Sequence, residues 1–394
     1  MLEDLRRTQG HVASDIENDV KEGYLPSSLL FSGPRGSSRL TGALELAFNL
    51  TSEDGNYPYL RSSQIVYLMQ RDMRMETEAA LSLFQRQRND RFRMFLIKTV
   101  RKTLLQYHVS IAPLYEGKKS GVKLSAKDER GDTLFSNAQA VDAIILSLED
   151  GCDFKEQSVD AIVSELRARM NNDFFTLGKR SIGATIDEIR AVQDWLEEGI
   201  SEKCLILEDP ESLTEGAKNS MLKLLEEPPE HCHIILLSSQ PARLLPTILS
   251  RVRKYNFPAL SEKAISSLIG EELAIYGSYS SFDSFFFEEG SADEDKNTLD
   301  EAVSLYFRAL VDGRMLTPDE EENLFAAVEH LNCYAYFRER LIGEMMKAFQ
   351  SVKDQRKIKR AWKILTDAMI KADAYNMNKK LAFDAALRES CYGE

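Results

Sequence analysis

The sequence has few cysteines and no long apolar run, and both absences narrow the class of protein. Five cysteines are spread over 394 residues and include no CxxC pair, which argues against a zinc module or a redox couple. Charged residues interrupt the hydrophobic ones throughout, so no segment approaches the roughly 18 apolar residues of a membrane span. Residues 1–20 are charged rather than signal-like. We therefore expect a cytoplasmic protein with reduced thiols and no bound metal.

The charge balance limits the partners that the chain can have. A net charge of −13 argues against a protein that coats nucleic acid with its whole surface, although a local basic stripe can still meet phosphate. A length of 394 residues predicts two or three domains, and 43% hydrophobic residues can fill their cores.

Alternating apolar patterns predict an α/β core with a doubly wound parallel sheet. Short apolar runs at 29–31, 65–68, 204–207 and 234–237 predict buried strands. Helical spacing predicts helices at 40–48 and 181–199, and Ser212 with Glu215 predicts a capping box for a helix that ends at Pro228. Residues 116–136 and 290–295 look like loops. After residue 258 the pattern is nearly all helix, with C-terminal helices at 335–350, 355–373 and 377–389.

The segment after the first predicted strand has the outline of a phosphate-binding loop. Such a loop needs glycines, a lysine for the phosphates and a hydroxyl for Mg²⁺. Here Gly33 is kept, but Ser38, Arg39 and Leu40 replace the second glycine, the lysine and the hydroxyl. A Gly/Pro turn with no phosphate-binding history is the alternative. The candidate nucleotide-contacting residues are Gly33, Pro34, Arg35, Gly36, Ser37, Ser38 and Arg39.

Two carboxylates follow the predicted strand at 204–207. Glu208 and Asp209 occupy the places of a metal-binding Asp and a water-polarising Glu, in inverted order. Two adjacent carboxylates after a strand are also common as a solvated turn or a helix-capping pair. We interpret them as a degenerate acidic motif that belongs with the degenerate phosphate loop.

Residues 205–257 carry a long and specific resemblance to the clamp-loader family of AAA+ proteins. The segment LEEPP at 225–229 and the segment LLPTILSR at 244–251 resemble family motifs, and Val252 replaces the cysteine of the Ser-Arg-Cys motif. The resemblance implies that Arg251, beside Ser250, is an arginine finger that reaches the ATP of a neighbouring subunit. An arginine that closes a helix or forms an intrachain salt bridge is the alternative.

A degraded phosphate loop with a retained finger arginine resembles the delta-prime type of subunit in that family more than the ATP-hydrolysing gamma/tau type. This implies an AAA+ core at 1–258, a small helical lid at 259–325 and an all-α collar at 326–394. The implied role is that of an accessory subunit of DNA polymerase III without activity alone. It would assemble with delta and gamma/tau subunits to load a sliding clamp on primer-template DNA.

In this reading the chain needs no cofactor of its own and contacts ATP in trans. Zinc is not expected, because residues 51–115 lack the four cysteines that the family usually carries there. Two rival interpretations remain open. One is an active AAA+ ATPase of gamma/tau type, and the other is a non-enzymatic AAA+ scaffold in DNA repair.

A basic segment lies within residues 70–180, which we expect to be a helical insertion in the core. Its cations alternate with apolar residues, which predicts an amphipathic helix or helical hairpin that contacts DNA or a neighbouring subunit. A solvated charged face is the alternative. The His231-Cys232-His233 sequence does not predict a metal site, because neighbouring side chains on an extended segment point to opposite faces. The candidate contact residues are Arg86, Arg88, Arg91, Arg93, Arg101 and Lys102.

Overall fold

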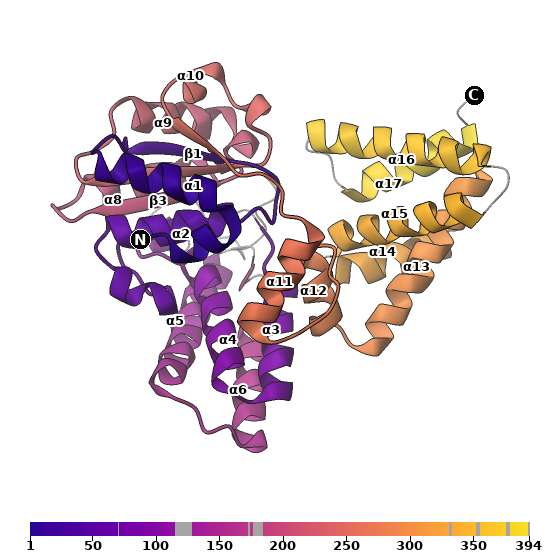
Figure 1. Cartoon of the computed structure of the whole chain (residues 1–394), viewed down its shortest axis with the longest axis horizontal. Helices are drawn as coiled ribbons and strands as arrows, with labels where there is room; N and C mark the ends of the chain where they lie inside the picture. Colours follow the sequence, from indigo (N-terminus) through magenta and orange to yellow (C-terminus); the bar gives the residue numbers. More distant parts are fainter. Residues whose placement is uncertain are drawn as a thin grey trace. The chain divides into compact units, whose positions relative to one another are not determined.

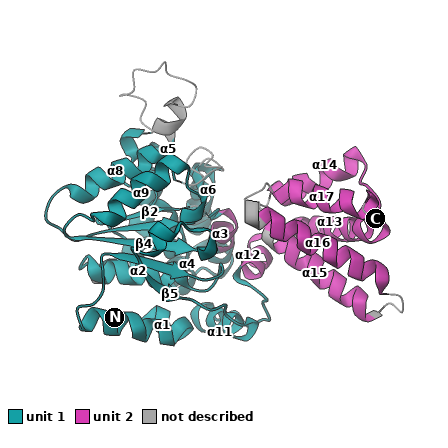
Figure 2. Cartoon of the chain, turned by 90° about the horizontal axis from the view of Figure 1, so that it is seen from above, with its two compact units in different colours: residues 1–73, 80–282 teal, residues 74–79, 283–394 magenta. Residues whose placement is uncertain are grey.

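The computed structural model describes the chain except for residues 70, 115–127, 172–173, 176–183, 331–332, 352–354, 376–378 and 393–394. The described residues form two compact units (Figure 2). The first unit comprises residues 1–73 and 80–282, and the second comprises residues 74–79 and 283–394. Nothing in the structure decides between these two units and the three predicted domains, so the boundaries at 258 and 325 stay predictions.

A five-stranded parallel sheet forms the centre of the first unit (Figure 1). Its order is β2-β3-β4-β1-β5, and every neighbouring pair is parallel. Every residue of β1, β2 and β3 is buried, because helices cover both faces. The strands are β1 (Ser28–Ser32), β2 (Ile65–Leu68), β3 (Lys203–Glu208), β4 (Cys232–Ser238) and β5 (Arg253–Asn256).

Helices pack on the two faces of this sheet. Figure 2 shows α8 (Ile186–Glu197) and α9 (Glu215–Glu226) on one face, and α1 (Glu3–Lys21) and α2 (Arg39–Leu50) on the other. The apolar stripes of α8 and α9 join side chains of β2, β3 and β4 in one buried cluster. Thr185 begins α8 with a capping box, in which its side chain accepts from the Glu188 amide and Glu188 accepts from the Thr185 amide.

The described part of residues 70–180 is largely helical. Its helices α4, α5 and α6 pack in sequence order, α4 on α5 and α5 on α6. The α-helices here are α3 (Arg74–Gln87), α4 (Asp90–Leu104), α5 (Asp128–Asp150) and α6 (Glu156–Arg169). The first unit also contains α10 (Pro246–Leu249) and α11 (Glu262–Leu273), with 3₁₀ turns η1 (Asp54–Tyr59), η2 (Ala112–Leu114), η3 (Pro210–Ser212) and η4 (Pro241–Arg243).

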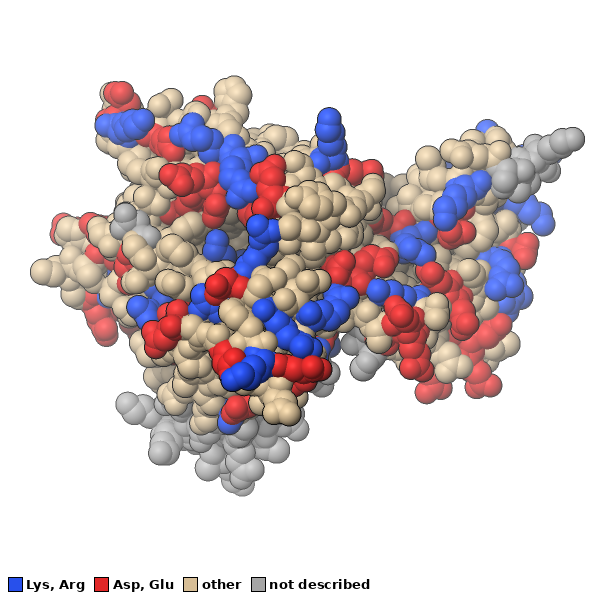
Figure 3. All heavy atoms as spheres, turned by 60° about the horizontal axis from the view of Figure 1, so that its bottom comes forward, with Lys and Arg blue, Asp and Glu red and all other residues tan. Residues whose placement is uncertain are grey.

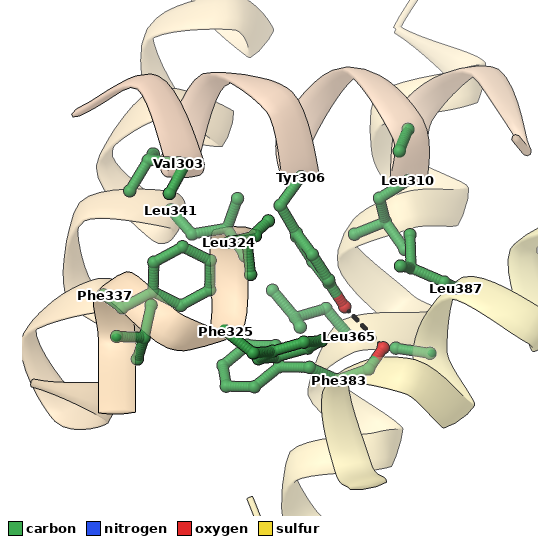
Figure 4. Packing of buried hydrophobic residues seen from close by; sticks show 14 of the residues in the cluster. Val303, Tyr306, Leu310, Leu324, Phe325, Phe337, Leu341, Leu365, Phe383 and Leu387 are labelled. Carbon is green, nitrogen blue, oxygen red and sulfur yellow. Dashed lines mark hydrogen bonds between the residues drawn. The ribbon is translucent and has the colours of Figure 1, made fainter. Parts of the chain in front are cut away.

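The second unit is built from helices around its own core. Tyr306 lies at the centre of this core, with Phe337 and Phe383 edge-on to its ring (Figure 4). Its hydroxyl donates a 2.8 Å hydrogen bond to the Phe383 carbonyl oxygen. Gly290 approaches the start of α3 so closely that a Cβ there would lie 2.8 Å from the Ala79 nitrogen. The helices are α12 (Phe282–Gly290), α13 (Asp293–Asp312), α14 (Pro318–His330), α15 (Tyr334–Ser351), α16 (Arg356–Tyr375) and α17 (Lys379–Tyr392).

The structure confirms the predicted α/β class and parallel sheet, and it corrects several local predictions. Thr214, not Ser212, caps α9, because the η3 turn precedes that helix and directs the Ser212 hydroxyl to the Asp209 carbonyl. Residues 128–136 are helical rather than a loop, since α5 begins at Asp128, whereas 116–127 lie outside the described residues. Residues 293–295 form the first turn of α13 instead of a linker. In the described part of the chain, no helix is long and apolar enough to cross a membrane.

The buried hydroxyl of Tyr306 provides a test of the second core. We expect Tyr306→Phe to lower the free energy of unfolding by about 1 kcal/mol, because it removes a buried hydrogen bond and leaves the ring packing intact. Urea unfolding followed by circular dichroism measures this difference. Tyr392→Phe, at a side chain that is 79% exposed, is the matched control and should change nothing. Equal effects of the two substitutions would contradict the assigned hydrogen bond.

Candidate functional site

The candidate phosphate loop connects the carboxyl end of β1 to the amino end of α2. Gly33 is required there, because a Cβ would lie 2.0 Å from the Phe257 carbonyl oxygen. Gly36 and Ser38 both have left-handed backbone conformations, with φ of 75° and 64°. The Ser37 hydroxyl donates to the Pro34 carbonyl at 2.7 Å. The loop is therefore a tight, internally bonded turn.

Gln9 of α1 ties this loop to the end of the sheet. Its side-chain amide donates to the Ser37 carbonyl at 3.1 Å and to the Pro258 carbonyl at 2.7 Å. Gln9 sits at a kink in α1, where its φ and ψ leave the helical range. Sequence reasoning missed this residue, since a glutamine inside a charged helix gives no signal of a long-range contact.

The two arginines of the loop have different environments. Arg35 is exposed and its Nη2 lies 3.0 Å from Asp209 Oδ2. Arg39, at the position of the usual lysine, is only 4% exposed, and its Nη1 has no hydrogen-bond partner among the described residues. Burial, with the nearby charge of Arg71, lowers the pKa of Arg39 from its usual value. The position of the usual lysine is therefore still occupied by a cation, but the cation is the bulkier guanidinium of Arg39.

Glu208 is the most strongly held carboxylate of the site. It is 1% exposed, and Arg71 approaches one of its oxygens, Oε1, with Nε at 2.9 Å and Nη2 at 2.6 Å. The Tyr67 hydroxyl donates to the other oxygen, Oε2, at 2.7 Å. Burial alone would raise the pKa of Glu208, but the charge and hydrogen bonds of Arg71 outweigh it and lower that pKa to about 2.

Arg71 and Tyr67 were not predicted from the sequence. Both come from the strand β2 and the residues just after it, and parallel strands place their carboxyl ends at one edge of the sheet. One signal in the sequence could have found the pair of Arg71 and Glu208. Arg71 follows a predicted buried strand, and Glu208 directly follows another predicted strand.

The acidic motif does not fit a divalent cation at Glu208. Both of its oxygens already accept hydrogen bonds from Arg71 and Tyr67, and a guanidinium excludes a metal from the same oxygen by charge. Leu40 offers no oxygen ligand, and Asp209 lies in a left-handed turn with φ of 48° and pairs with Arg35. The arrangement can neutralise its own carboxylates without a metal.

Arg251 lies at the surface beyond α10. Its Nη1 donates to the Thr247 carbonyl at 2.7 Å, and its Nη2 lies 2.6 Å from Glu226 Oε1 at the end of α9. The Arg251 side chain is 32% exposed. The neighbouring Ser250 hydroxyl donates to the Thr247 carbonyl and Arg251 donates to Ser250. The intrachain salt bridge, one of the alternatives for this residue, is thus present.

The predicted basic residues lie on α3, on α4 and between them, but they do not form one stripe. Arg101 is 4% exposed and pairs with Asp142 and Glu149 of α5, so the prediction that it contacts DNA or a partner is wrong for this conformation. Arg93 bonds Asp90 and the Leu148 carbonyl.

The other basic residues of this segment vary in exposure. Arg88 pairs with Glu156, and Lys102 is half-buried. Arg86 and Arg91 are exposed. Figure 3, which brings the bottom of Figure 1 forward, shows basic and acidic side chains interspersed over this face. Contact with DNA or a partner through the exposed members stays a prediction.

His231 and His233 both approach one carboxylate. His231 Nδ1 and His233 Nε2 lie 2.9 Å and 3.5 Å from the two oxygens of Glu202, as expected for side chains two positions apart on an extended segment. Within the described residues, no group of three or more His, Cys, Asp or Glu side chains is arranged to hold a metal ion.

Comparison of the sequence with known proteins finds relatives of parts of the chain. A family model described as "DNA polymerase III, delta subunit" matches residues 96–261. The DNA polymerase III subunit delta' of Bacillus subtilis is 27% identical over 180 residues, which cover 45% of this chain and 51% of that protein. Over these segments the chain is similar to subunits of the DNA polymerase III clamp loader.

Two further relatives also match parts of the chain. Subunit tau of Bacillus subtilis is 29% identical over 43% of this chain and 28% of its own length. Subunit delta' of Escherichia coli is 34% identical over 27% of this chain and 34% of its own length. The chain thus spans about half or less of the length of these relatives.

The pair formed by Arg71 and Glu208 provides a test of the site. We expect Arg71→Met to lower the free energy of unfolding at pH 7 by about 3 kcal/mol, because it leaves a buried carboxylate unpaired. Adding Glu208→Gln to Arg71→Met should recover much of this loss. Urea unfolding at several pH values measures both variants.

The pH dependence follows from the low pKa of Glu208. A carboxylate with a lowered folded-state pKa stabilises the fold above its unfolded pKa of 4.5 and loses that contribution as the pH falls towards 2. In Arg71→Met the carboxyl group can take up a proton, so its deficit relative to wild type should shrink between pH 7 and pH 4. A deficit independent of pH would argue against the ion pair.

Proposed function

We propose that the chain is a non-hydrolysing, delta-prime-like subunit of a DNA polymerase III clamp loader. In this role it assembles with delta and gamma/tau subunits and helps to load a sliding clamp on primer-template DNA. The family-model match and the similarity to delta' subunits of two bacteria support the proposal. The chain requires no cofactor of its own and contacts ATP only on a neighbouring subunit.

The observation that carries the proposal is the occupied carboxylate of Glu208. Turnover of ATP needs a metal between carboxylate, hydroxyl and phosphate oxygens. In this chain Arg71 binds the carboxylate, and Leu40 stands at the position of the hydroxyl. Arg39 adds a buried guanidinium close to the half-buried Arg71, so the site is crowded with fixed cations. This arrangement favours a site that no longer hydrolyses nucleotide.

The position of Arg251 supports its role as an arginine finger in trans. Thr247 and Glu226 hold the two Nη atoms, while the side chain remains about one-third exposed, at 32%. A planar guanidinium fixed on one side can offer its remaining N–H groups to a phosphate across an interface. Arg251 would then stabilise the negative charge that develops on the neighbour's γ-phosphate.

The two rival functions differ in what the isolated chain does. Similarity to subunit tau favours an active ATPase of gamma/tau type. Measurable ATP hydrolysis by the isolated chain would support that rival. A non-enzymatic scaffold in DNA repair would instead fail to assemble with delta and gamma/tau subunits.

Substitution of Arg251 tests the proposal. We expect Arg251→Ala to remove the turnover of the ATP site that it serves, by about 10³-fold at that site, with little change in KM. The measurement is the DNA-stimulated ATPase rate of the reconstituted loader. Arg243→Ala, at an exposed arginine of η4, is the matched control. An unchanged rate in an assembled complex would reject the finger.

The exposed arginines of α3 and α4 carry a second part of the proposal, contact with DNA or a neighbouring subunit. We expect Arg86→Ser with Arg91→Ser to remove about two phosphate contacts. The slope of log affinity against log salt for primer-template binding should therefore become less steep. Binding by the reconstituted loader, measured over a range of salt concentrations, gives this slope. Arg190→Ser with Arg243→Ser makes the same charge change elsewhere on the surface. If both pairs give the wild-type slope and assembly is normal, these arginines make no such contact.

A further inference from the structure

The outer face of α16 gathers exposed cations around an exposed tryptophan. Its opposite face is apolar and packs into the core of the second unit through Ala361, Ile364, Leu365 and Ala368. Six of the nine exposed side chains on the outer face are cations, and acidic side chains are absent from these nine. We call this surface the α16 basic face. Its exposed residues are Arg356, Lys357, Lys359, Arg360, Trp362, Lys363, Thr366, Ile370 and Lys371.

Three lysines of the α16 basic face are not paired with carboxylates in the way that cations of other basic segments are. Lys357, Lys363 and Lys371 have no ion-pair partner among the described residues. Asp367, the carboxylate of α16 whose side chain is described, is half-buried. On α4, by contrast, Arg93 and Arg101 pair with carboxylates.

The sequence around α16 reinforces this asymmetry within the second unit. Residues 356–392 contain nine Lys and Arg and four Asp and Glu, whereas residues 293–330 contain three Lys and Arg and eleven Asp and Glu. The unit therefore concentrates its positive charge in the segment of α16 and α17. An anionic partner fits the α16 basic face by charge, and the acidic segments disfavour binding of such a partner elsewhere.

Apolar exposure distinguishes this face from an ordinary solvated one. Trp362 is 38% exposed and Ile370 is 60% exposed. Water can solvate the neighbouring cations, but it does not favour exposure of these two apolar side chains. Trp362 and Lys363 lie three and four positions after Lys359, so each is one turn from that lysine on the helix surface. Aromatic rings beside cations are the pattern of surfaces that stack bases and hold a phosphate backbone.

We propose that the α16 basic face binds single-stranded nucleic acid. The lysines would contact phosphates, and Trp362 would stack on a base. A duplex fits less well, because its bases are already stacked and cannot use the exposed indole. A helix of 20 residues is about 30 Å long, which is enough to follow several nucleotides. This inference goes beyond the proposed function and rests on the chain alone.

The fluorescence of Trp362 provides a local test. The chain has two tryptophans, and Trp195→Phe leaves Trp362 as the single emitter. Trp195 is half-buried in the first unit beside His108 and Lys203. We expect a twelve-nucleotide oligo-dT to quench Trp362 emission in the full chain at low salt. Quenching should weaken as salt rises, because phosphate contacts release counterions.

Substitution of the three lysines tests the charge. Lys357→Ser, Lys363→Ser and Lys371→Ser together should reduce the slope of log affinity against log salt by about 2, since each single-strand phosphate contributes about 0.7. The control combines Lys223→Ser, Lys254→Ser and Lys263→Ser, which makes the same charge change at exposed lysines of the first unit. The control should keep the parent slope.

Substitution of the tryptophan tests stacking. With dye-labelled oligo-dT and anisotropy as the readout, Trp362→Ala should weaken binding roughly tenfold and Trp362→Phe should weaken it less. All of these side chains are exposed, so circular dichroism should match the parent chain.

Several outcomes would overturn the proposal. Absence of quenching at low salt, or equal losses in the two triple variants, would reject single-stranded binding at this face. Equal quenching by poly-L-glutamate would indicate an acidic protein partner instead. Emission that responds to delta or gamma/tau subunits, but not to oligo-dT, would assign the face to subunit contact.

Discussion

A buried carboxylate must be neutralised, and at the carboxyl edge of this sheet the neutralising group is an arginine of the same chain. Glu208 ends a strand whose residues are all buried, so water cannot solvate its charge. Arg71 and Tyr67, both supplied by β2 and the residue stretch after it, satisfy the two oxygens. The register of β2 against β3 therefore sets the electrostatics of the whole site, because it brings these groups opposite one another.

The same constraint explains how the loop and the acidic motif can coexist without a metal. Each carboxylate of the motif has its own guanidinium, Arg71 for Glu208 and Arg35 for Asp209. Gln9 then closes the loop against Pro258. Replacing a diffusible cation by covalently attached ones makes the local charge independent of ligand concentration. Both carboxylates are thereby balanced by cations of the same chain.

The sequence predicts the sheet well and the side-chain partners poorly, for physical reasons. Buried strands such as 204–207 and 234–237 appear as continuous apolar runs, and the loop after β1 is marked by its glycines. By contrast, β5 contains exposed polar residues and gives no apolar run. The burial of Arg101 depends on Asp142 and Glu149 of α5, and the partner of Glu208 lies 137 positions away. Such contacts are set by tertiary packing, which local periodicity does not encode.

The second unit is discontinuous in sequence, since residues 74–79 belong with residues 283–394. During synthesis the first piece leaves the ribosome about 200 residues before the rest, and it stays without its helical partners while the sheet forms. Gly290 and Met75 mark where the two pieces meet. The order of folding is therefore constrained: the sheet unit can mature during translation, whereas the helical unit is completed only after residues 283–394 have been made. Dissection at residue 282 would produce a C-terminal fragment that lacks one of its own segments.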